Sequence, residues 1–191
     1  MAAVESQMLP LGTQAPAFHI PDADGTMRSL DDAAGCQAYL VMFICNHCPF
    51  VKHVADELAR LGKEYQAKDV AVFAINSNDI ENYPADGPEE MKQEAARRGY
   101  TFPYLLDADQ SVAKSYLAAC TPDYYLFDAD RKLVYRGQLD GSRPGNAVAV
   151  DGRDLRRAID AVLARDPVAD EQVPSIGCNI KWIPGNAPDY F

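Results

Sequence analysis

The 191-residue sequence contains no apolar stretch long enough to span a bilayer, and it is poor in basic residues. Lysine and arginine total 18 against 28 aspartates and glutamates, which gives a formal net charge of -10. An acidic surface repels phosphate backbones. We therefore expect neither a membrane span nor a nucleic-acid partner.

The first ten residues also lack the basic patch and apolar core of a secretory signal, which predicts a cytoplasmic protein. The chain has five cysteines, an odd number that cannot all pair with one another. In a reducing compartment, closely spaced cysteines are more often catalytic or metal-binding than structural. Cysteine chemistry is therefore the first candidate for function.

Two unbroken apolar runs, at 39–44 and 70–75, dominate the first half of the chain. Their length is typical of strands covered on both faces, as in a parallel sheet. Between them, apolar residues at helical spacing predict an amphipathic helix: Val51, Val54, Leu58, Leu61 and Tyr65. With 48% hydrophobic and 24% charged residues, the composition is that of a globular domain.

The rest of the chain predicts further elements around this unit. We expect an N-terminal β extension near 16–20, helices over 88–99 and 155–163, and an antiparallel hairpin of 124–127 with 133–135. Insertions fall at 79–100 and 138–152, and the apolar tail 166–191 should pack on the domain. The prediction is one α/β domain over 1–191, with a central mixed sheet flanked by helices.

The segment Cys45-Asn46-His47-Cys48 directly follows the first buried strand, and Pro49 suits the first turn of a helix. Two cysteines at this spacing can form a small disulfide. We expect Cys45 at the helix N-terminus, where the dipole lowers the pKa of a thiol and makes it the nucleophile. Cys48 would then resolve the mixed disulfide, and a protonated His47 would stabilise the thiolate.

Other interpretations of the pair remain open. Zinc usually takes four ligands in two clusters, but no second cysteine pair is present and His19 lies far away in the sequence. Two inert buried cysteines are a further alternative, because cysteine is often a small core residue. We expect neither a metal nor an organic cofactor.

Further along, Cys120-Thr121-Pro122 precedes an apolar strand. Together with the strand, C-x-x-C and helix, this segment resembles the Thr-Pro turn of thioredoxin-like proteins. The resemblance implies that Pro122 is cis and faces the cysteine pair. It also implies that the backbone of Thr121 docks an extended substrate segment.

The whole chain resembles the peroxiredoxin-like branch of the alkyl hydroperoxide reductase/thiol-specific antioxidant superfamily, which implies a thioredoxin-like fold. The similar segments are 12–18, 43–49, 74–78, the Thr-Pro turn and 177–182. Aligned with true peroxiredoxins, Cys48 stands at the peroxide-attacking cysteine, and Cys45 replaces the threonine that organises peroxide. No acid is carried over from thioredoxins, so the possible proton relays are Glu57, Asp79 and Glu81.

The sequence thus predicts a thiol–disulfide oxidoreductase with Cys45 as nucleophile and Cys48 as resolving thiol. Its substrates would be protein or small-molecule disulfides or peroxides, and its electron donor is not specified. The alternatives are a thiol peroxidase and a non-catalytic redox-sensing binding domain. Cys178 and Cys120 are possible auxiliary thiols, each with packing as the other interpretation, and Cys36 is expected to be structural.

Overall fold

The computed structural model describes residues 3–191 and is built around a five-stranded sheet with the strand order β6-β5-β4-β8-β9. Its strands are β4 (Ala38–Phe43), β5 (Val70–Asn76), β6 (Tyr104–Leu106), β8 (Asp123–Asp128) and β9 (Leu133–Tyr135). β4, β5 and β6 run parallel to one another, β8 runs antiparallel to β4, and β9 runs antiparallel to β8. The predicted mixed sheet and its antiparallel hairpin are therefore confirmed.

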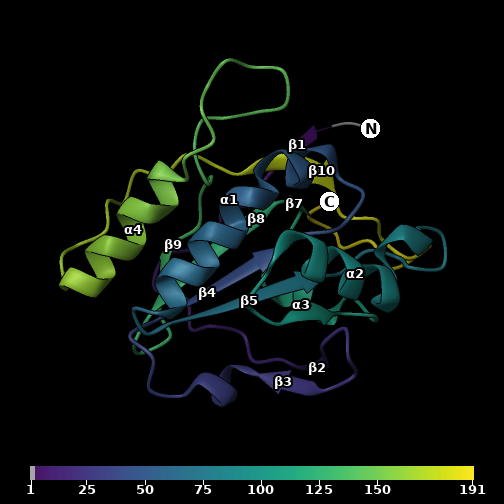
Figure 1. The fold of residues 1–191 in the computed structure, drawn as a ribbon, viewed down its shortest axis with the longest axis horizontal. Helices are drawn as coiled ribbons and strands as arrows, with labels where there is room; N and C mark the ends of the chain where they lie inside the picture. Colours follow the sequence, from purple (N-terminus) through teal and green to yellow (C-terminus); the bar gives the residue numbers. More distant parts are fainter. Residues whose placement is uncertain (1–2) are drawn as a thin grey trace.

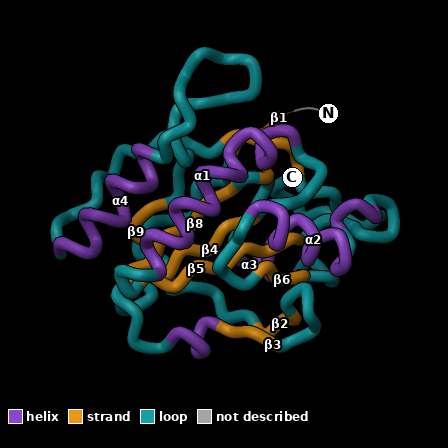
Figure 2. The backbone as a smooth tube through the Cα atoms, in the orientation of Figure 1, coloured by secondary structure: helices purple, strands orange, loops and turns teal. Residues whose placement is uncertain are grey.

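Helices and shorter segments cover both faces of this sheet (Figures 1 and 2). The helices are α1 (Pro49–Gln66), α2 (Pro88–Arg98), α3 (Ser111–Ser115) and α4 (Arg153–Ala164), with short 3-10 turns η1 (Leu30–Ala33) and η2 (Pro84–Asp86). In the part of the chain described, no helix has the length and apolar character that crossing a membrane requires.

Alternate residues of the central strands feed two separate cores. Leu40 and Met42 of β4 pack in a cluster with residues of α1 and α4, while Val41 and Phe43 pack on the opposite side with Tyr116 and neighbours. All six residues of β4 are buried. The unbroken apolar run is thus explained, because a strand covered on both faces has no polar side.

Two smaller sheets complete the structure. The predicted N-terminal β extension is a hairpin of β2 (His19–Pro21) and β3 (Met27–Ser29) that turns at Asp24-Gly25, and its first strand begins later than residue 16. A three-stranded sheet with the order β1-β10-β7 joins β1 (Ala3–Glu5), β10 (Ile176–Asn179) and β7 (Cys120–Thr121). This second sheet brings the C-terminal tail to the Thr-Pro turn.

The strand β10 lies unusually close to that turn. A Cβ atom added at Gly177 would lie 2.0 Å from the main-chain oxygen of Thr121 and 3.0 Å from the nitrogen of Pro122. These are backbone atoms, which cannot rotate away. Position 177 therefore accepts only glycine if β10 is to pair with β7 in this register.

Replacing Gly177 by alanine should detach β10 from β7. We expect the G177A variant to lose ~3 kcal/mol of unfolding free energy, because the extra methyl group overpacks a contact between two backbones. Urea denaturation measures the loss. G141A is the matched control, because a Cβ there meets only Val148 Cγ1 at 3.8 Å. Equal stability of both variants would contradict the close approach.

Candidate functional site

The two cysteines of the C-x-x-C segment lie between the end of β4 and the start of α1. The helix begins at Pro49, and Cys48 is its N-cap residue. The expectation that Cys45 occupies the helix N-terminus is therefore wrong. The chain stays non-helical through Asn46 and His47, so Cys45 lies before the helix begins. Cys48 is therefore the cysteine nearest to the free N–H groups of α1.

Thr121 contacts both sulfur atoms. Its hydroxyl lies 3.4 Å from Cys45 Sγ, and its main-chain oxygen accepts a hydrogen bond from the Cys48 thiol at 3.2 Å. The Thr121–Pro122 peptide bond is cis, as the resemblance to thioredoxin-like proteins implies. The structure thus brings together the cysteine pair and the Thr-Pro turn, although 73 residues separate Cys48 from Thr121 along the chain.

The two auxiliary cysteines differ in their relation to the pair. Cys178 lies opposite Thr121 in the register of β10 with β7, and the nearby Cys48 contributes to raising the pKa of its thiol. Cys120 is buried beside the turn, and its thiol donates to the carbonyl of Pro122 at 3.5 Å. Cys178 is therefore part of the site, and Cys120 is its neighbour.

Among the thiols of Cys45, Cys48 and Cys178, the surroundings favour a negative charge on Cys48. Hydrogen bonding from Cys45 lowers the pKa of Cys48 to about 5 against the opposing effect of burial, and the Cys178 thiol and the Val51 N–H group add to the lowering. The same bond to Cys48, together with burial and the charge of Asp86, raises the pKa of Cys45. These directions favour a negative charge on Cys48, whereas the sequence led us to expect it on Cys45.

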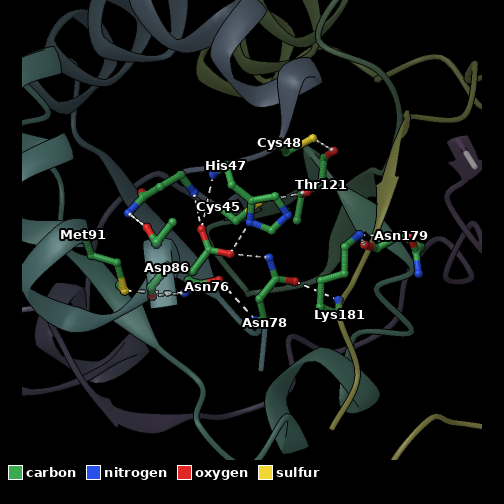
Figure 3. A network of polar contacts seen from close by, with 12 residues as sticks. Cys45, His47, Cys48, Asn76, Asn78, Asp86, Met91, Thr121, Asn179 and Lys181 are labelled. Atoms are coloured by element: carbon green, nitrogen blue, oxygen red, sulfur yellow. Dashed lines mark hydrogen bonds and ion pairs between the residues drawn. The ribbon is translucent and has the colours of Figure 1, made fainter. Parts of the chain in front are cut away.

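Asp86 is the acid that the sequence analysis missed. Its carboxylate is completely buried on η2, and His47 Nδ1 lies 2.6 Å from Asp86 Oδ2 (Figure 3). The other carboxylate oxygen accepts the backbone N–H groups of Asn46 at 2.8 Å and His47 at 3.3 Å. Burial raises the pKa of Asp86, but the bonds from His47 and Asn78 outweigh it, and the net shift is downward.

The three acids that the sequence suggested as proton relays, Glu57, Asp79 and Glu81, form other contacts or are exposed. Glu57 is buried in α1 and forms ion pairs with Arg60 and Arg156, each at 2.7 Å. Asp79 accepts hydrogen bonds from its own turn, at Glu81 and Asn82, and Glu81 is exposed. The only sequence signal for Asp86 was its position in the 79–100 insertion after β5.

A chain of amides ties Asp86 to the C-terminal tail (Figure 3). Asn78 donates its side-chain NH₂ to Asp86 Oδ2 at 2.8 Å and accepts the backbone N–H of Lys181 on its own oxygen at 2.8 Å. Asn76 donates to the main-chain oxygen of Asp86 at 2.8 Å. The carboxylate is therefore fixed by β5, by the C-x-x-C segment and by the residues after β10.

One group of potential metal ligands lies here. Single ligand atoms of Cys45, His47 and Asp86 all fall within 4.8 Å of one another. The two oxygens of Asp86 already accept four hydrogen bonds, from Asn46 N, His47 N, His47 Nδ1 and Asn78 Nδ2. Hydrogen bonding accounts for this arrangement without an ion, and the carboxylate acts on His47.

The thiols themselves are closed off from solvent. Cys45 is 2% exposed and Cys48 is 0% exposed. A cavity of about 20 Å³, enough for one water molecule, lies against Pro122 between His53 and Tyr124. An extended polypeptide therefore reaches the sulfurs only if a covering segment moves.

Removing the charge of Asp86 should be costly. We expect D86N to lower the unfolding free energy by about 2–4 kcal/mol, because the introduced NH₂ group faces donors on Asn78 or His47 in a buried site. Urea denaturation measures the change, with E81Q as the exposed control on the same loop. A D86N protein as stable as E81Q would show that the carboxylate does not hold the site together.

The amino-acid sequence is similar to those of known redox proteins. The chain is 31% identical over 102 residues to a Mycobacterium tuberculosis protein described as a candidate peroxiredoxin, covering 53% of this chain and 59% of that protein. The chain thus spans about three fifths of that curated relative. It is 23% identical over 130 residues to the thiol-disulfide oxidoreductase ResA of Bacillus thuringiensis, covering 68% of this chain and 70% of that protein.

Solved structures support the fold. An uncharacterized conserved protein from Geobacillus kaustophilus shares 57% identity, with a TM-score of 0.94 over 97% of this chain and 98% of that chain. The thioredoxin domain of a Bacteroides vulgatus thiol-disulfide oxidoreductase matches with a TM-score of 0.60 at 19% identity, over 79% of this chain and 99% of that chain. The fold is therefore thioredoxin-like, as the sequence predicts.

The sequence pattern of the AhpC/TSA family matches residues 11–136, which hold the central strands, α1, both cysteines and the Thr-Pro turn. The Mycobacterium tuberculosis and Bacillus thuringiensis relatives are described as oxidoreductases. The chain belongs to the AhpC/TSA family, and it is a peroxiredoxin-like protein of the thioredoxin fold.

Proposed function

We propose that the protein is a thiol–disulfide oxidoreductase that cycles between the Cys45/Cys48 dithiol and a Cys45–Cys48 disulfide. One observation carries the proposal: Cys48 is the N-cap residue of α1, and Thr121 contacts both sulfurs, with its hydroxyl 3.4 Å from Cys45 Sγ and its main-chain oxygen 3.2 Å from Cys48 Sγ. Two neighbouring thiols, one of them at the N-cap of a helix, supply the nucleophile and the resolving group of disulfide exchange. The chemistry needs no metal or organic cofactor.

The charge distribution favours Cys48 as the attacking thiolate and Cys45 as the resolving thiol, the reverse of the order expected from the sequence. Negative charge on Cys48 is supported by the bonds from Cys45, Cys178 and the Val51 N–H group. A charge on Cys45 would instead lie near the buried carboxylate of Asp86. Two anions close together in a buried site repel each other strongly.

In the proposed reaction, the Cys48 thiolate attacks one sulfur of a substrate disulfide and expels the other sulfur as a thiolate. The Cys45 thiol then loses its proton and attacks Cys48, which forms the Cys45–Cys48 bond and releases the second substrate thiolate. The proton and one more from solvent neutralise the two leaving groups. The substrate is reduced by two electrons, and the pair is oxidised by two.

His47 is the proposed acceptor for the proton of Cys45. One ring nitrogen lies within 4.8 Å of the Cys45 sulfur, and Nδ1 is held by Asp86. The other nitrogen, Nε2, has no hydrogen-bond partner within the described residues. A base oriented by a carboxylate beside a thiol is the usual arrangement for activating a nucleophile.

A thiol peroxidase is the second candidate, and the closed edge of β7 favours it. The backbone of Thr121, which the resemblance assigns to substrate docking, is paired with Cys178 of β10. An extended protein segment would have to displace β10, whereas a hydroperoxide is small enough to enter through modest motions. In this reaction the Cys48 thiolate attacks the terminal oxygen of the peroxide, the O–O bond breaks, and the leaving alkoxide or hydroxide takes up a proton. The Cys45 thiol then condenses with the Cys48 sulfenic acid, which forms the Cys45–Cys48 disulfide and releases water.

The family, and not the geometry of the site, suggests the oxidants and the electron donor. The oxidants are disulfides or peroxides, and an external thiol donor returns the two electrons. A cytoplasmic location suits five cysteines that are all free. Under this proposal Thr121 and Pro122 position the pair, and they dock an extended substrate only when β10 has moved.

The ionisation of Cys48 should be visible in the reduced protein. We expect a thiolate absorbance step at 240 nm that disappears as the pH falls through about 5, since the pKa of Cys48 is lowered to about 5. C48S should remove the step, and C45A should shift it to higher pH because alanine has no donor in place of the Cys45 thiol. C36S is the control. A wild-type midpoint at the ordinary thiol value refutes the assignment.

A trapping experiment tests the roles of the two cysteines. Both variants carry C178S, so that no third thiol lies beside the pair. With 2-hydroxyethyl disulfide, C45S/C178S should accumulate a mixed disulfide on Cys48, detected by mass spectrometry of the intact protein, and C48S/C178S should not react. Trapping only on Cys45 would restore the order expected from the sequence, and trapping on neither would end the proposal.

Hydrogen peroxide given to C45S/C178S in a stopped-flow instrument separates the two candidates. A peroxidase should oxidise Cys48 far faster than a free thiol reacts. A rate equal to that of free cysteine, combined with a trapped mixed disulfide, leaves the disulfide reaction as the function.

A further inference from the structure

The strand β10 occupies the place where the resemblance to thioredoxin-like proteins puts a bound substrate. It pairs antiparallel with β7, with Cys178 opposite Thr121 and Asn179 opposite Cys120. Ile180 donates its backbone N–H to Ala119 at 3.0 Å and continues the pairing. The residue opposite Thr121 in this strand is itself a cysteine.

The side chain of Cys178 faces the cysteine pair. Residues directly opposite each other in an antiparallel ladder project to the same face. Thr121 projects towards Cys45, because its hydroxyl lies 3.4 Å from Cys45 Sγ. Cys178 therefore projects to this face too, where the main-chain oxygen of its partner Thr121 accepts a hydrogen bond from the Cys48 thiol.

The position of Cys178 is fixed on every side. β1 pairs with the other edge of β10, with Ala3 opposite Cys178. Gly177 lets β10 approach the Thr121 carbonyl, and the Lys181 N–H is bound by Asn78 beyond the strand. A thiol held in this way is presented to Cys48 without the entropy that a free tail would lose.

We propose that Cys178 is a third redox thiol, which exchanges with Cys48 inside the same chain and forms a Cys48–Cys178 disulfide. The inference rests on the proposed function of the pair, which it extends by one internal step. β10 thereby presents its cysteine to Cys48 as a strand of a bound substrate would.

The step is an exchange with no net change in oxidation state. Cys178 loses its proton and attacks the Cys48 sulfur of the Cys45–Cys48 disulfide. The Cys48–Cys178 bond forms, the Cys45–Cys48 bond breaks, and Cys45 leaves as a thiolate that takes up a proton. The same attack on a mixed disulfide between Cys48 and a small thiol releases that thiol.

The electrostatics agree with this order of events. In the reduced protein, burial and the bond to Cys48 raise the pKa of Cys178 to about 11, so that it is a protonated donor. Once Cys48 is part of a disulfide, its charge is gone and that part of the shift is removed. Cys178 is thus held inactive until Cys48 has reacted. Cys120 has no such relation to the pair, because its thiol faces the carbonyl of Pro122.

The lifetime of the mixed disulfide on Cys48 tests the inference. In a C36S background, which frees the tryptic peptide of Cys48 from a second thiol, C45S and C45S/C178S are each reacted with 2-hydroxyethyl disulfide. We expect C45S, which retains Cys178, to release 2-mercaptoethanol at least about tenfold faster, because an oriented intramolecular thiol acts at high effective concentration. The product should be one Cys48–Cys178 cross-linked peptide per chain.

The matched control is C45S/C120S, which should behave like C45S, because Cys120 is an equally buried cysteine of the adjacent strand. Equal lifetimes with and without Cys178, and no cross-linked peptide, would overturn the inference while leaving the proposed function intact. Failure of C45S/C178S to form any mixed disulfide would instead count against the proposed function itself. Circular dichroism confirms that each variant is folded.

Discussion

The contacts of Thr121 with three cysteines are the interaction on which the site depends. Its hydroxyl touches Cys45, its carbonyl accepts from Cys48, and its backbone pairs with Cys178. The three thiols come from the end of β4, the cap of α1 and the C-terminal strand, and Thr121 of β7 contacts all three segments. A strand of only two residues therefore determines which sulfurs can meet.

Burial explains why the charge of the site is arranged as it is. A low-dielectric interior penalises every anion and magnifies repulsion between two of them. Asp86 is stabilised as a carboxylate by His47, Asn78 and backbone N–H groups, so a second negative charge is best placed on the sulfur farther from it. The charge of Asp86 raises the pKa of Cys45, whereas it is not among the causes that shift the pKa of Cys48. The polarity of the pair thus follows from the position of one acid.

The sequence predicted the elements that local pattern determines. The apolar runs gave β4 and β5, the helical stripe gave α1, and the C-x-x-C spacing located the cysteines. It did not predict β7 with β10 or the role of Asp86. A two-residue strand has no periodicity to detect, and Asp86 lies in a Pro- and Gly-containing insertion where only the folded structure shows which carboxylate meets His47. The helix start was misplaced by one turn because Pro49, and not Cys45, marks its first residue.

The pairing of β7 with β10 also changes what the family resemblance implies for the recognition of extended substrates. Strand addition requires free N–H and C=O groups along an exposed edge. At β7 those groups face β10, whose other edge is covered in turn by β1. A peptide that docks at Thr121 must first replace hydrogen bonds that the chain already makes, and it gains only the difference between the two sets of contacts. A small oxidant makes no such exchange. The occupied edge therefore selects against extended substrates at the buried pair, and it places the Cys178 thiol where a substrate cysteine would otherwise exchange with Cys48.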